Sequence, residues 1–429
     1  MIRPSRRVGS SIVGPKNKPR EQAVTADSAG HQQLLKDINR MSLVRQLFAH
    51  PGMSRADLAA AVGLTKSTVS TIVRELIEEG WMCEREVVAT GDLGRRPTPM
   101  FIDQERLLLI GAEVDIESAR VVATSLTGEV VASATANFGA GKAAKACIGG
   151  LANAMLTVRA QLDSSRQRVV GIGVGLPGGV DEDTGFLHFA PNLGWRDVAV
   201  GSMLRDKLAG SALSGVPTFL QNEADVAALG EVEFNPSIAS DPLLYLSMNQ
   251  GVGAGVIFSD RLLTGRRGFA GEVGHMVLHI NGPMCSCGRR GCAEALIGPR
   301  AILGSEDEHP HPLREIRRLM QERHPETLRA IKKAGGYLGV LLQNLASAYD
   351  PGSIVIGGQM AELGDVFLQP ALRTLTAYAA AANLPPPNVR SSRFGRDAVA
   401  VGAAALVRYR LTRPLMGTID GEASVEMAA

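Results

Sequence analysis

Three cysteines lie within eight residues of one another, in the run Cys285-Ser286-Cys287-Gly288-Arg289-Arg290-Gly291-Cys292, and His275 precedes the first of them by ten residues. Three thiolates and one imidazole make a complete tetrahedral ligand set for Zn²⁺. Gly288 and Gly291 allow the tight loop that brings the three sulfurs together. Because four protein ligands leave no open position for water or substrate, the sequence predicts a structural zinc site rather than a catalytic one.

The composition is that of a globular protein kept in a reducing compartment. The chain has 429 residues, 45% of them hydrophobic, and five cysteines, too few for a disulfide scaffold. Outside the cluster the chain has only Cys83 and Cys147, which are predicted core residues. Because cysteine is so rare elsewhere, chance clustering of the other three as free thiols is a poor alternative to a metal site. No run of about 18 apolar residues occurs, and the basic N-terminus has no apolar segment behind it. We therefore expect a cytoplasmic protein without a membrane span.

The net charge of +2 conceals an asymmetry along the chain. Residues 1–102 hold 15 Lys and Arg against 10 Asp and Glu, whereas residues 103–429 hold 30 against 33, so the basic surplus lies at the front. Such a surplus favours contact with an acidic polymer such as DNA. Residues 1–30 are basic and contain Gly, Pro and Ser without apolar periodicity, which predicts a disordered arm. The alternative is that this arm is only a solvated tail.

Three helices and a hairpin are predicted between residues 31 and 102. The first helix carries a one-sided apolar stripe at Leu34, Leu35, Ile38, Met41, Val44, Leu47 and Phe48. Ser54 and Asp57 have the spacing of a capping box at the start of a short second helix. Thr65 caps a third helix, whose apolar positions are Val69, Ile72, Val73, Leu76 and Ile77. Strands at 81–88 and 100–102 complete a winged helix-turn-helix domain.

The outward face of the third helix has the residue types expected for reading DNA. Its positions are small, polar or basic: Lys66, Ser67, Thr68, Ser70, Thr71 and Arg74. Such side chains approach base edges and phosphates without steric bulk. Arg95 and Arg96 lie at the predicted wing tip, where they would touch a minor groove or phosphates. A helical protein-interaction module is the alternative, but the helix lengths, the turn and the hairpin together favour DNA binding.

Beyond residue 102 the pattern changes to alternating strands and helices. The predicted strands are 107–114, 120–125, 130–135, 169–175, 243–247, 253–258 and 353–356. The predicted helices include 143–162 and 327–349. This alternation, sustained over the long remainder of the chain, is typical of an α/β protein with helices on both faces of its sheets, here arranged in two lobes.

Further motifs follow one another in a fixed order between residues 105 and 410. They are Gly173 to Asp181, Ala190 to Trp195, Asn222 to Asp225, Asp350 to Gly358 and Gly402 to Ala404. Together with the cysteine cluster and its flanks, Gly271 to His275 and Ala293 to Ala295, they resemble the ROK family, which groups bacterial sugar kinases with sugar-responsive transcriptional repressors. The resemblance implies a two-lobed actin-like ATPase fold. We therefore expect an α/β protein with a winged helix-turn-helix domain (31–102) followed by a ROK sugar-kinase-like domain (103–429) for effector binding and oligomerisation.

The phosphate-binding motifs depart from those of the family's kinases. Where those enzymes have a Gly-Gly-Thr turn whose backbone N–H groups receive ATP phosphates, this chain has Asp115-Ile116-Glu117, whose two carboxylates repel a triphosphate. Glu223 replaces the catalytic aspartate, and its extra methylene displaces the carboxylate by about 1 Å, which costs roughly 100-fold in rate. The second phosphate loop, Asn249 to Gly255, is also altered. These changes predict that phosphoryl transfer is lost.

The sugar side of the resemblance is intact. It implies that sugar hydroxyls contact Asn222, Glu223, Glu272, His275 and Glu294, with Asn192 as a further candidate. Carboxylates and amides suit hydroxyl groups, which both donate and accept hydrogen bonds. His275 would bind zinc through one ring nitrogen and offer the other to a hydroxyl, so that the metal orients a sugar ligand.

The sequence thus predicts a DNA-binding regulator of carbohydrate metabolism, a repressor whose operator binding is modulated by a sugar in a catalytically inactive kinase-like cleft. An ATP-dependent, glucokinase-like sugar kinase with an appended DNA-binding domain is the alternative, and an interaction scaffold is a third. We expect a homodimer or homotetramer, because operators for this DNA-binding motif are usually palindromic. Pentoses, hexoses, amino sugars and phosphorylated sugars all remain candidate effectors, and either release or promotion of DNA binding remains open.

Overall fold

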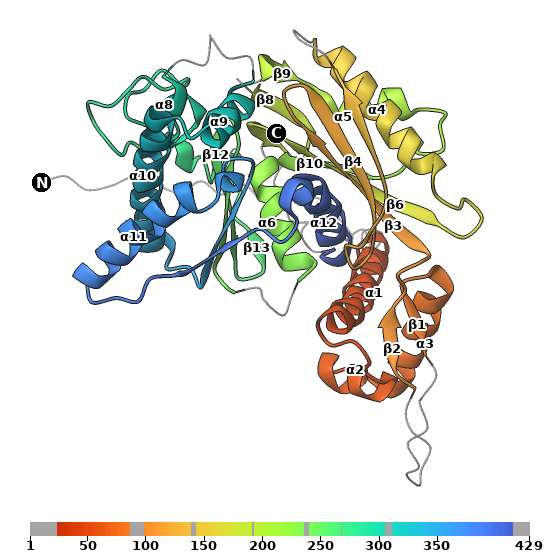
Figure 1. Ribbon diagram of the computed structural model, residues 1–429. Coiled ribbons are helices and arrows are strands. Elements are labelled where there is room, and N and C mark those ends of the chain that lie inside the picture. The colour runs from red at the N-terminus through yellow and green to blue at the C-terminus, as the bar shows by residue number, and fades with distance from the viewer. Residues whose placement is uncertain are drawn as a thin grey trace, which may run out of the picture.

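The computed structural model describes residues 24–85, 98–138, 143–190, 193–235, 240–266, 268–304 and 311–414. Three parts follow one another along the chain: a helical domain with a small hairpin, and two lobes that each contain a five-stranded sheet (Figure 1). This arrangement confirms the predicted α/β architecture with two lobes and an N-terminal winged helix-turn-helix. None of the described helices is long and apolar enough to cross a membrane.

The N-terminal domain contains three helices and a two-stranded antiparallel sheet: α1 (Val24–Ala49), α2 (Arg55–Val62), α3 (Lys66–Glu79), β1 (Met82–Glu84) and β2 (Met100–Ile102). The predicted apolar stripes form its core, which includes the fully buried Val44, Leu47, Leu58, Val69 and Leu76. The first helix begins at Val24, ten residues before the predicted stripe, so residues 24–30 of the expected disordered arm are helical. Apolar periodicity marks only the packed part of a helix, and this extension carries none. Residues 1–23 and 86–97 lie outside the described part of the chain.

Lobe one is built on a sheet with the strand order β10-β6-β3-β4-β5. Its strands are β3 (Leu107–Val114), β4 (Ser118–Ser125), β5 (Val130–Asn137), β6 (Arg168–Leu176) and β10 (Thr218–Asn222). Alternate residues of β3 point to opposite faces, so Leu108 and Ile110 pack in one core cluster with α4 (Ala144–Ala160), while Leu107 and Leu109 join another with α12 (Ala398–Thr412). A small sheet and one helix complete the lobe: β7 (Gly179–Asp181), β8 (Phe186–Ala190), β9 (Trp195–Val198) and α5 (Val200–Leu208).

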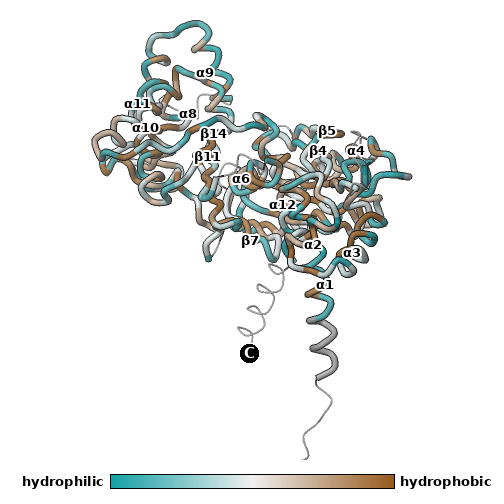
Figure 2. The backbone as a smooth tube through the Cα atoms, turned by 90° about the horizontal axis from the view of Figure 1, so that it is seen from below, coloured by the Kyte–Doolittle hydropathy of each residue, from teal (hydrophilic) through white to brown (hydrophobic). Residues whose placement is uncertain are grey.

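Lobe two is built on a sheet with the strand order β13-β12-β11-β14-β15. Its strands are β11 (Leu243–Met248), β12 (Val252–Phe258), β13 (Arg261–Leu262), β14 (Ser353–Gly357) and β15 (Asn388–Ser391). Its helices are α7 (Ala293–Ile297), α8 (Pro299–Leu303), α9 (Pro312–Gln321), α10 (Pro325–Tyr349) and α11 (Asp365–Ala381), with 3₁₀ turns at Val273–His275, Ala361–Leu363 and Gly395–Asp397. In Figure 2 the hydrophobic colour marks β11 and β14 inside this lobe, whereas α9 is largely hydrophilic.

A central layer of two helices, α6 (Glu223–Glu233) and α12, separates the two sheets (Figure 1). Glycine permits the close approach of these helices to each other and to lobe one. A Cβ on Gly173 of β6 would lie 1.8 Å from the carbonyl oxygen of Ala403 in α12. A Cβ on Gly402 of α12 would lie 2.1 Å from the carbonyl oxygen of Val226 in α6. The central helices are therefore packed backbone against backbone and have little freedom to slide.

The predicted strand positions agree closely with the structure. The predicted segments 107–114, 169–175, 243–247 and 353–356 lie within one residue of the ends of β3, β6, β11 and β14. The predicted helix 327–349 corresponds to α10, which starts two residues earlier at Pro325, a residue favoured in the first turn of a helix. The predicted strand 81–88 is described only as far as β1, which ends at Glu84.

Candidate functional site

The six polar positions predicted to read DNA all lie exposed on α3. Lys66, Ser67, Thr68, Ser70, Thr71 and Arg74 face solvent, while the opposite face is buried. The hydroxyl of Ser70 donates to the carbonyl oxygen of Lys66 at 2.8 Å, and that of Thr71 to the carbonyl oxygen of Ser67 at 3.2 Å. In this arrangement the two hydroxyl oxygens keep lone pairs for DNA, whereas Lys66 and Arg74 present positive charge. Arg95 and Arg96 fall outside the described residues.

The orientation of α3 is fixed by caps and ion pairs. Its N-cap Thr65 accepts a hydrogen bond from the amide of Thr68 at 3.2 Å. The preceding helix begins with the predicted capping box, in which Asp57 accepts from the amide of Ser54 at 2.9 Å. Arg40 of α1 is buried and pairs with Glu75 of α3 at 2.8 Å. Separating a buried cation from its carboxylate would cost several kcal/mol of stability, so α1 and α3 should move as one body.

Replacing Arg74 by alanine is expected to weaken operator binding by about tenfold, the effect of losing one guanidinium contact to a phosphate or base. Zinc content and thermal stability should not change, because the side chain is exposed and has no hydrogen bond or ion pair recorded among the described residues. A fluorescence-anisotropy titration at fixed salt measures the effect. Arg166→Ala, an exposed arginine of lobe one, is the matched control. Equal operator affinities for the Arg74 and Arg166 variants would exclude the α3 face as the DNA contact.

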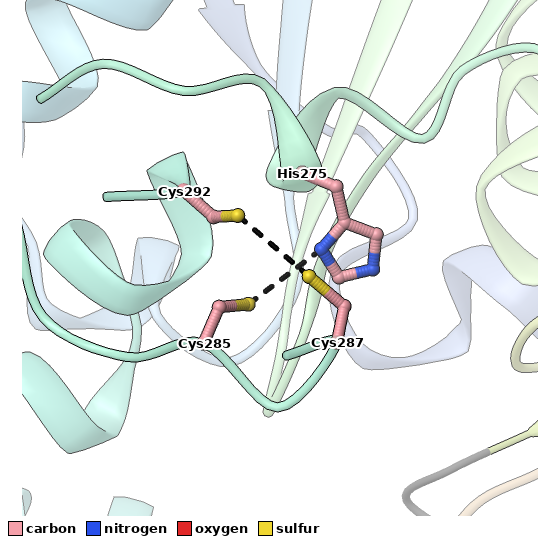
Figure 3. Close-up of side chains that lie close together, drawn as sticks. All are labelled: His275, Cys285, Cys287 and Cys292. Atoms are coloured by element: carbon pink, nitrogen blue, oxygen red, sulfur yellow. Dashed lines mark hydrogen bonds between the residues drawn. The ribbon is translucent and has the colours of Figure 1, made fainter. Parts of the chain in front are cut away.

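The histidine and three cysteines predicted to bind metal converge on one point (Figure 3). One ligand atom from each of His275, Cys285, Cys287 and Cys292 lies within 4.8 Å of all the others. Cys285 Sγ is 3.7 Å from His275 Nδ1, and Cys287 Sγ is 3.7 Å from Cys292 Sγ. Separations of this size match the edges of a tetrahedron with Zn–S bonds of about 2.3 Å. The cluster can therefore hold a metal ion, and its soft sulfur ligands suit zinc.

The loop that carries the sulfurs is closed by backbone contacts. The amide of Cys285 donates to the carbonyl oxygen of Arg289 at 2.8 Å, and that of Gly291 to the carbonyl oxygen of Pro283 at 2.8 Å. Gly291 has a positive φ of 71°, and a Cβ there would lie 1.6 Å from the carbonyl oxygen of His279. No side chain is tolerated at that position, which explains the glycine directly before the third cysteine.

His275 faces two sites at once. It ends the 3₁₀ turn Val273–His275, and its Nδ1 points into the cysteine cluster. Its Nε2 lies 3.8 Å from the carboxylate of Glu272. A metal bound at Nδ1 would hold the proton on Nε2, so the ring would present a fixed N–H to the space beside Glu272. This geometry leaves one ring nitrogen for a metal and the other for the space beside Glu272.

Five of the six predicted sugar residues line one cavity of about 490 Å³ between the lobes, termed the first cavity. Lobe one supplies its wall from Pro177 to Gly179, and lobe two supplies Gly251 to Gly253. The predicted residues on its surface are Asn222, Glu223, Glu272, His275 and Glu294. Asn192 lies outside the described residues. The volume suits a small polar ligand such as a monosaccharide.

Two of these side chains are held in place by the backbone. Asn222 caps α6 by accepting from the amide of Ala224 at 2.8 Å, and its amide group donates to the carbonyl oxygen of Gly178 at 2.9 Å. Glu294 accepts from the amide of Val252 at 3.2 Å. Each still has hydrogen-bonding capacity for a ligand, and each is oriented by contacts from its own side of the cavity.

Sequence reasoning missed three residues of the first cavity. Phe189 and Phe269 supply aromatic surface and Arg289 a guanidinium. Aromatic rings commonly pack against the apolar faces of bound ligands. Phe189 directly precedes the predicted segment Ala190 to Trp195, which is a signal that could have found it. Phe269 comes from a loop without periodicity, and its position two residues before the segment Gly271 to His275 is the one signal that could have found it.

Burial raises the pKa values of several carboxyl groups around the first cavity. The pKa of Glu223 is raised to about 7, mainly by burial and then by the charge of Asp115. Burial likewise raises the pKa of Glu272, which the neighbouring His275 partly offsets. The burial that disfavours a charged carboxylate in this cavity would equally disfavour the dianion of a phosphorylated ligand.

A second cavity of about 610 Å³ also lies between the lobes, where the altered phosphate turn is found. Asp115 lines it, and its carboxylate accepts from the amide of Ile116 at 2.7 Å. The amide of Asp115 donates to the carbonyl oxygen of Ser118 at 2.8 Å. Two of the three backbone donors of this turn, the amides of Asp115 and Ile116, are therefore already paired, and a carboxylate lies beside them.

Comparison with known proteins agrees with these features. A family model described as the ROK family matches residues 114–410, and one described as winged helix-turn-helix DNA-binding matches residues 36–81. The chain is 30% identical to a putative xylose repressor of Caldicellulosiruptor sp. (strain Rt8B.4), with 88% of this chain and 97% of that protein covered. It is 28% identical to a glucokinase of Thermotoga maritima, with 71% of this chain and 99% of that enzyme covered.

A solved structure shows the fold over almost the same length. A ROK family transcriptional regulator, described as a homolog of the E. coli MLC protein, superposes with a TM-score of 0.72 at 23% identity, covering 88% of this chain and 97% of that one. The winged helix-turn-helix and both lobes thus occur together in a known protein fold. With a family model matched over residues 114–410, more than half of its length, this chain belongs to the ROK family.

Proposed function

We propose that this protein is a sugar-responsive repressor: α3 binds operator DNA, and a sugar held in the first cavity changes that binding. The observation that carries the proposal is that one chain has both an exposed polar and basic face on α3 and a cavity lined by five predicted sugar residues. Two relatives of different kinds support it, because the alignment with the one named a repressor covers 88% of this chain, whereas that with the glucokinase covers 71%.

A DNA-binding titration tests the proposal. Promoter fragments neighbouring the protein's own gene are titrated at fixed salt with and without a panel of sugars, beginning with the two that the relatives' names supply, xylose and glucose. A sequence-specific complex whose affinity changes with one sugar is the expected result. Binding that depends only on salt, is blind to sequence and ignores every sugar would contradict it.

The proposal includes loss of phosphoryl transfer. Asp115 lies in the turn that matches the kinases' phosphate turn, the amides of Asp115 and Ile116 are paired, and by the family resemblance Glu223 replaces the kinases' catalytic aspartate. Release of ADP should therefore stay at background with ATP, Mg²⁺ and either glucose or xylose, in a coupled assay that detects a glucokinase. Sugar-dependent ADP release would establish the kinase alternative instead.

The proposal also assigns a structural zinc ion to the cluster of His275, Cys285, Cys287 and Cys292. Zinc would hold the loop that ends at α7, and through His275 it would orient the hydrogen-bond donor beside Glu272. Operator symmetry favours a homodimer or homotetramer, in which lobe rearrangement alters the spacing of two α3 helices.

Replacing Glu272 by alanine is expected to leave operator affinity unchanged and to weaken sugar binding by about 10–100-fold, the cost of losing a charged hydrogen-bond acceptor in a half-buried site. Glu272 lines the first cavity and belongs to lobe two, away from α3. Calorimetric titration of sugar and anisotropy titration of operator measure the two effects separately. Glu129→Gln, at an exposed glutamate of lobe one, is the control. A Glu272→Ala protein that responds to sugar like the unsubstituted protein would place the effector elsewhere.

A further inference from the structure

Five charged residues from three parts of the protein form one contiguous ion network beneath α12. Glu233 ends α6, Arg408 and Arg413 lie at the end of α12, Asp260 lies in the turn after β12, and Arg45 lies on α1. This set is termed the coupling network. Glu233 pairs with Arg408 at 2.8 Å and with Arg413 at 2.7 Å, and all three side chains are at least nine-tenths buried. Asp260 binds both Arg413 and Arg45, so the network reaches the DNA-binding domain.

Ring contacts strengthen the same junction. The guanidinium of Arg408 lies 4.0 Å from the ring centroid of Phe48, on α1, and 5.0 Å from that of Phe234, the C-cap of α6. It also donates to the carbonyl oxygen of Leu126, at the end of β4, at 3.2 Å. One buried cation thereby contacts α1, α6 and lobe one, and a desolvated cation over aromatic faces interacts with them strongly.

Two elements run from the first cavity to the coupling network. The helix α6 starts with Glu223 in the cavity wall and ends with Glu233 in the network, over a length of about 16 Å. The strand β12 starts with Val252 in the cavity wall and leads into the turn that carries Asp260. Since α6 is buried along its length and packed backbone against backbone on α12, it transmits a displacement rather than absorbing it.

The junction continues to the recognition helix. Arg40 of α1 pairs with Glu75 of α3 at 2.8 Å and is itself buried. Figure 1 shows α1 beneath α12, and α2 and α3 both pack against α1. A shift at the α12 junction therefore reorients α3 together with α1.

We propose that the coupling network transmits occupancy of the first cavity to the DNA-binding domain. The inference rests on the proposed function, because it assigns a route to the sugar response. A Cβ on Gly255 of β12 would lie 2.3 Å from the carbonyl oxygen of Ala224 in α6, so β12 and α6 move together. A ligand that binds between the lobes displaces both elements, and with them Glu233 and Asp260, relative to α1. Buried ion pairs lose much of their stability when one partner is left alone, so Arg408 and Arg413 must follow Glu233. The half-exposed pair of Asp260 with Arg45 and the stacking of Arg408 on Phe48 pass the shift to α1. The network thus has different preferred geometries in the empty and the occupied state.

Variants on the α1 side of the network test the inference without touching the cavity. Arg45→Ala removes the ion pair with Asp260, and Phe48→Leu removes the ring beneath Arg408 while keeping an apolar side chain. The measured quantity is the ratio of operator dissociation constants with and without a saturating sugar, xylose or glucose. Allosteric ratios are commonly 5–150-fold. We expect both variants to reduce the ratio at least about fivefold or to abolish it, with sugar affinity by calorimetry retained.

Two further proteins make the outcome decisive. Arg45→Lys keeps a cation beside Asp260 and should restore most of the response, whereas Arg318→Ala, an exposed arginine in ion pairs on α9, should respond like the unsubstituted protein. An unchanged ratio in both Arg45→Ala and Phe48→Leu would overturn the inference, as would loss of operator binding irrespective of sugar. An unsubstituted protein without any sugar response would overturn the proposed function itself, and the two failures are thereby distinguished.

Discussion

Replacement of Cys292 by serine is expected to reduce bound zinc from about one ion per chain to almost none. Cys292 is fully buried and points at the other three ligand atoms, within 4.8 Å of each. Serine has nearly the same volume, so the packing around it survives, but a neutral hydroxyl is a far poorer zinc ligand than a thiolate. Plasma emission spectroscopy of the purified variant measures the metal content directly.

The loss of metal should also reach the first cavity. Without the metal, His275 is free to change tautomer and rotamer, and the N–H that it offers beside Glu272 is no longer fixed. Removal of an outer-shell partner in metal sites typically costs 10–100-fold in affinity or activity, and we expect a similar loss of sugar affinity here. The melting temperature should fall as well, because the loop between His275 and α7 loses its anchor.

Cys83→Ser is the matched control for that experiment. Cys83 lies half-buried in β1, far along the chain from the cluster, and its thiol lies 4.0 Å from the carbonyl oxygen of Ile102. Its variant should retain zinc, sugar affinity and melting temperature. Retention of one zinc per chain in Cys292→Ser would show that the metal is bound elsewhere, and an intact sugar response after metal loss would separate the cluster from the cavity.

Local sequence signals predicted the DNA-binding domain well. The stripe Val69, Ile72, Val73 and Leu76 is buried as its spacing requires, and Thr65 caps α3. These features depend on neighbours within one helical turn, and that range is what periodicity and capping rules describe. The start of α1 was wrong by ten residues because a helix can continue as a polar extension after its packed stripe ends.

Long-range contacts were beyond the same reasoning. Arg45 and Asp260 are separated by 215 residues, and Arg408 and Glu233 by 175. Neither pair has a local pattern, because an isolated arginine or acid in a sequence is most often a solvated surface residue. The metal cluster was predictable since three of its four ligands lie in one short loop, whereas Phe269 reaches the first cavity only through the fold.

Glu223 is expected to make stability strongly dependent on pH. Its pKa is about 7 in the folded chain, raised by burial and by Asp115, against an unperturbed value of 4.5. Below pH 4.5 the group is protonated in both states and costs nothing. Between 4.5 and 7 the unfolded chain ionises while the folded chain keeps its proton, so folding stability falls as pH rises. Above pH 7 the penalty levels off at roughly 3 kcal/mol.

Glu223→Gln removes this titration while preserving the size of the side chain. The variant should match the unsubstituted protein near pH 4.5 and exceed it by up to about 3 kcal/mol at pH 8. Urea denaturation of the metal-loaded protein at pH 5, 6, 7 and 8 measures the difference, and the exposed Glu129→Gln should show none. A constant difference across this range would mean that Glu223 ionises freely. A difference in unfolding free energy that grows with pH would show that the Glu223 carboxyl group lowers stability when it ionises. Because neutral glutamine would serve the fold better, such a result favours a role for this carboxyl group in the cavity.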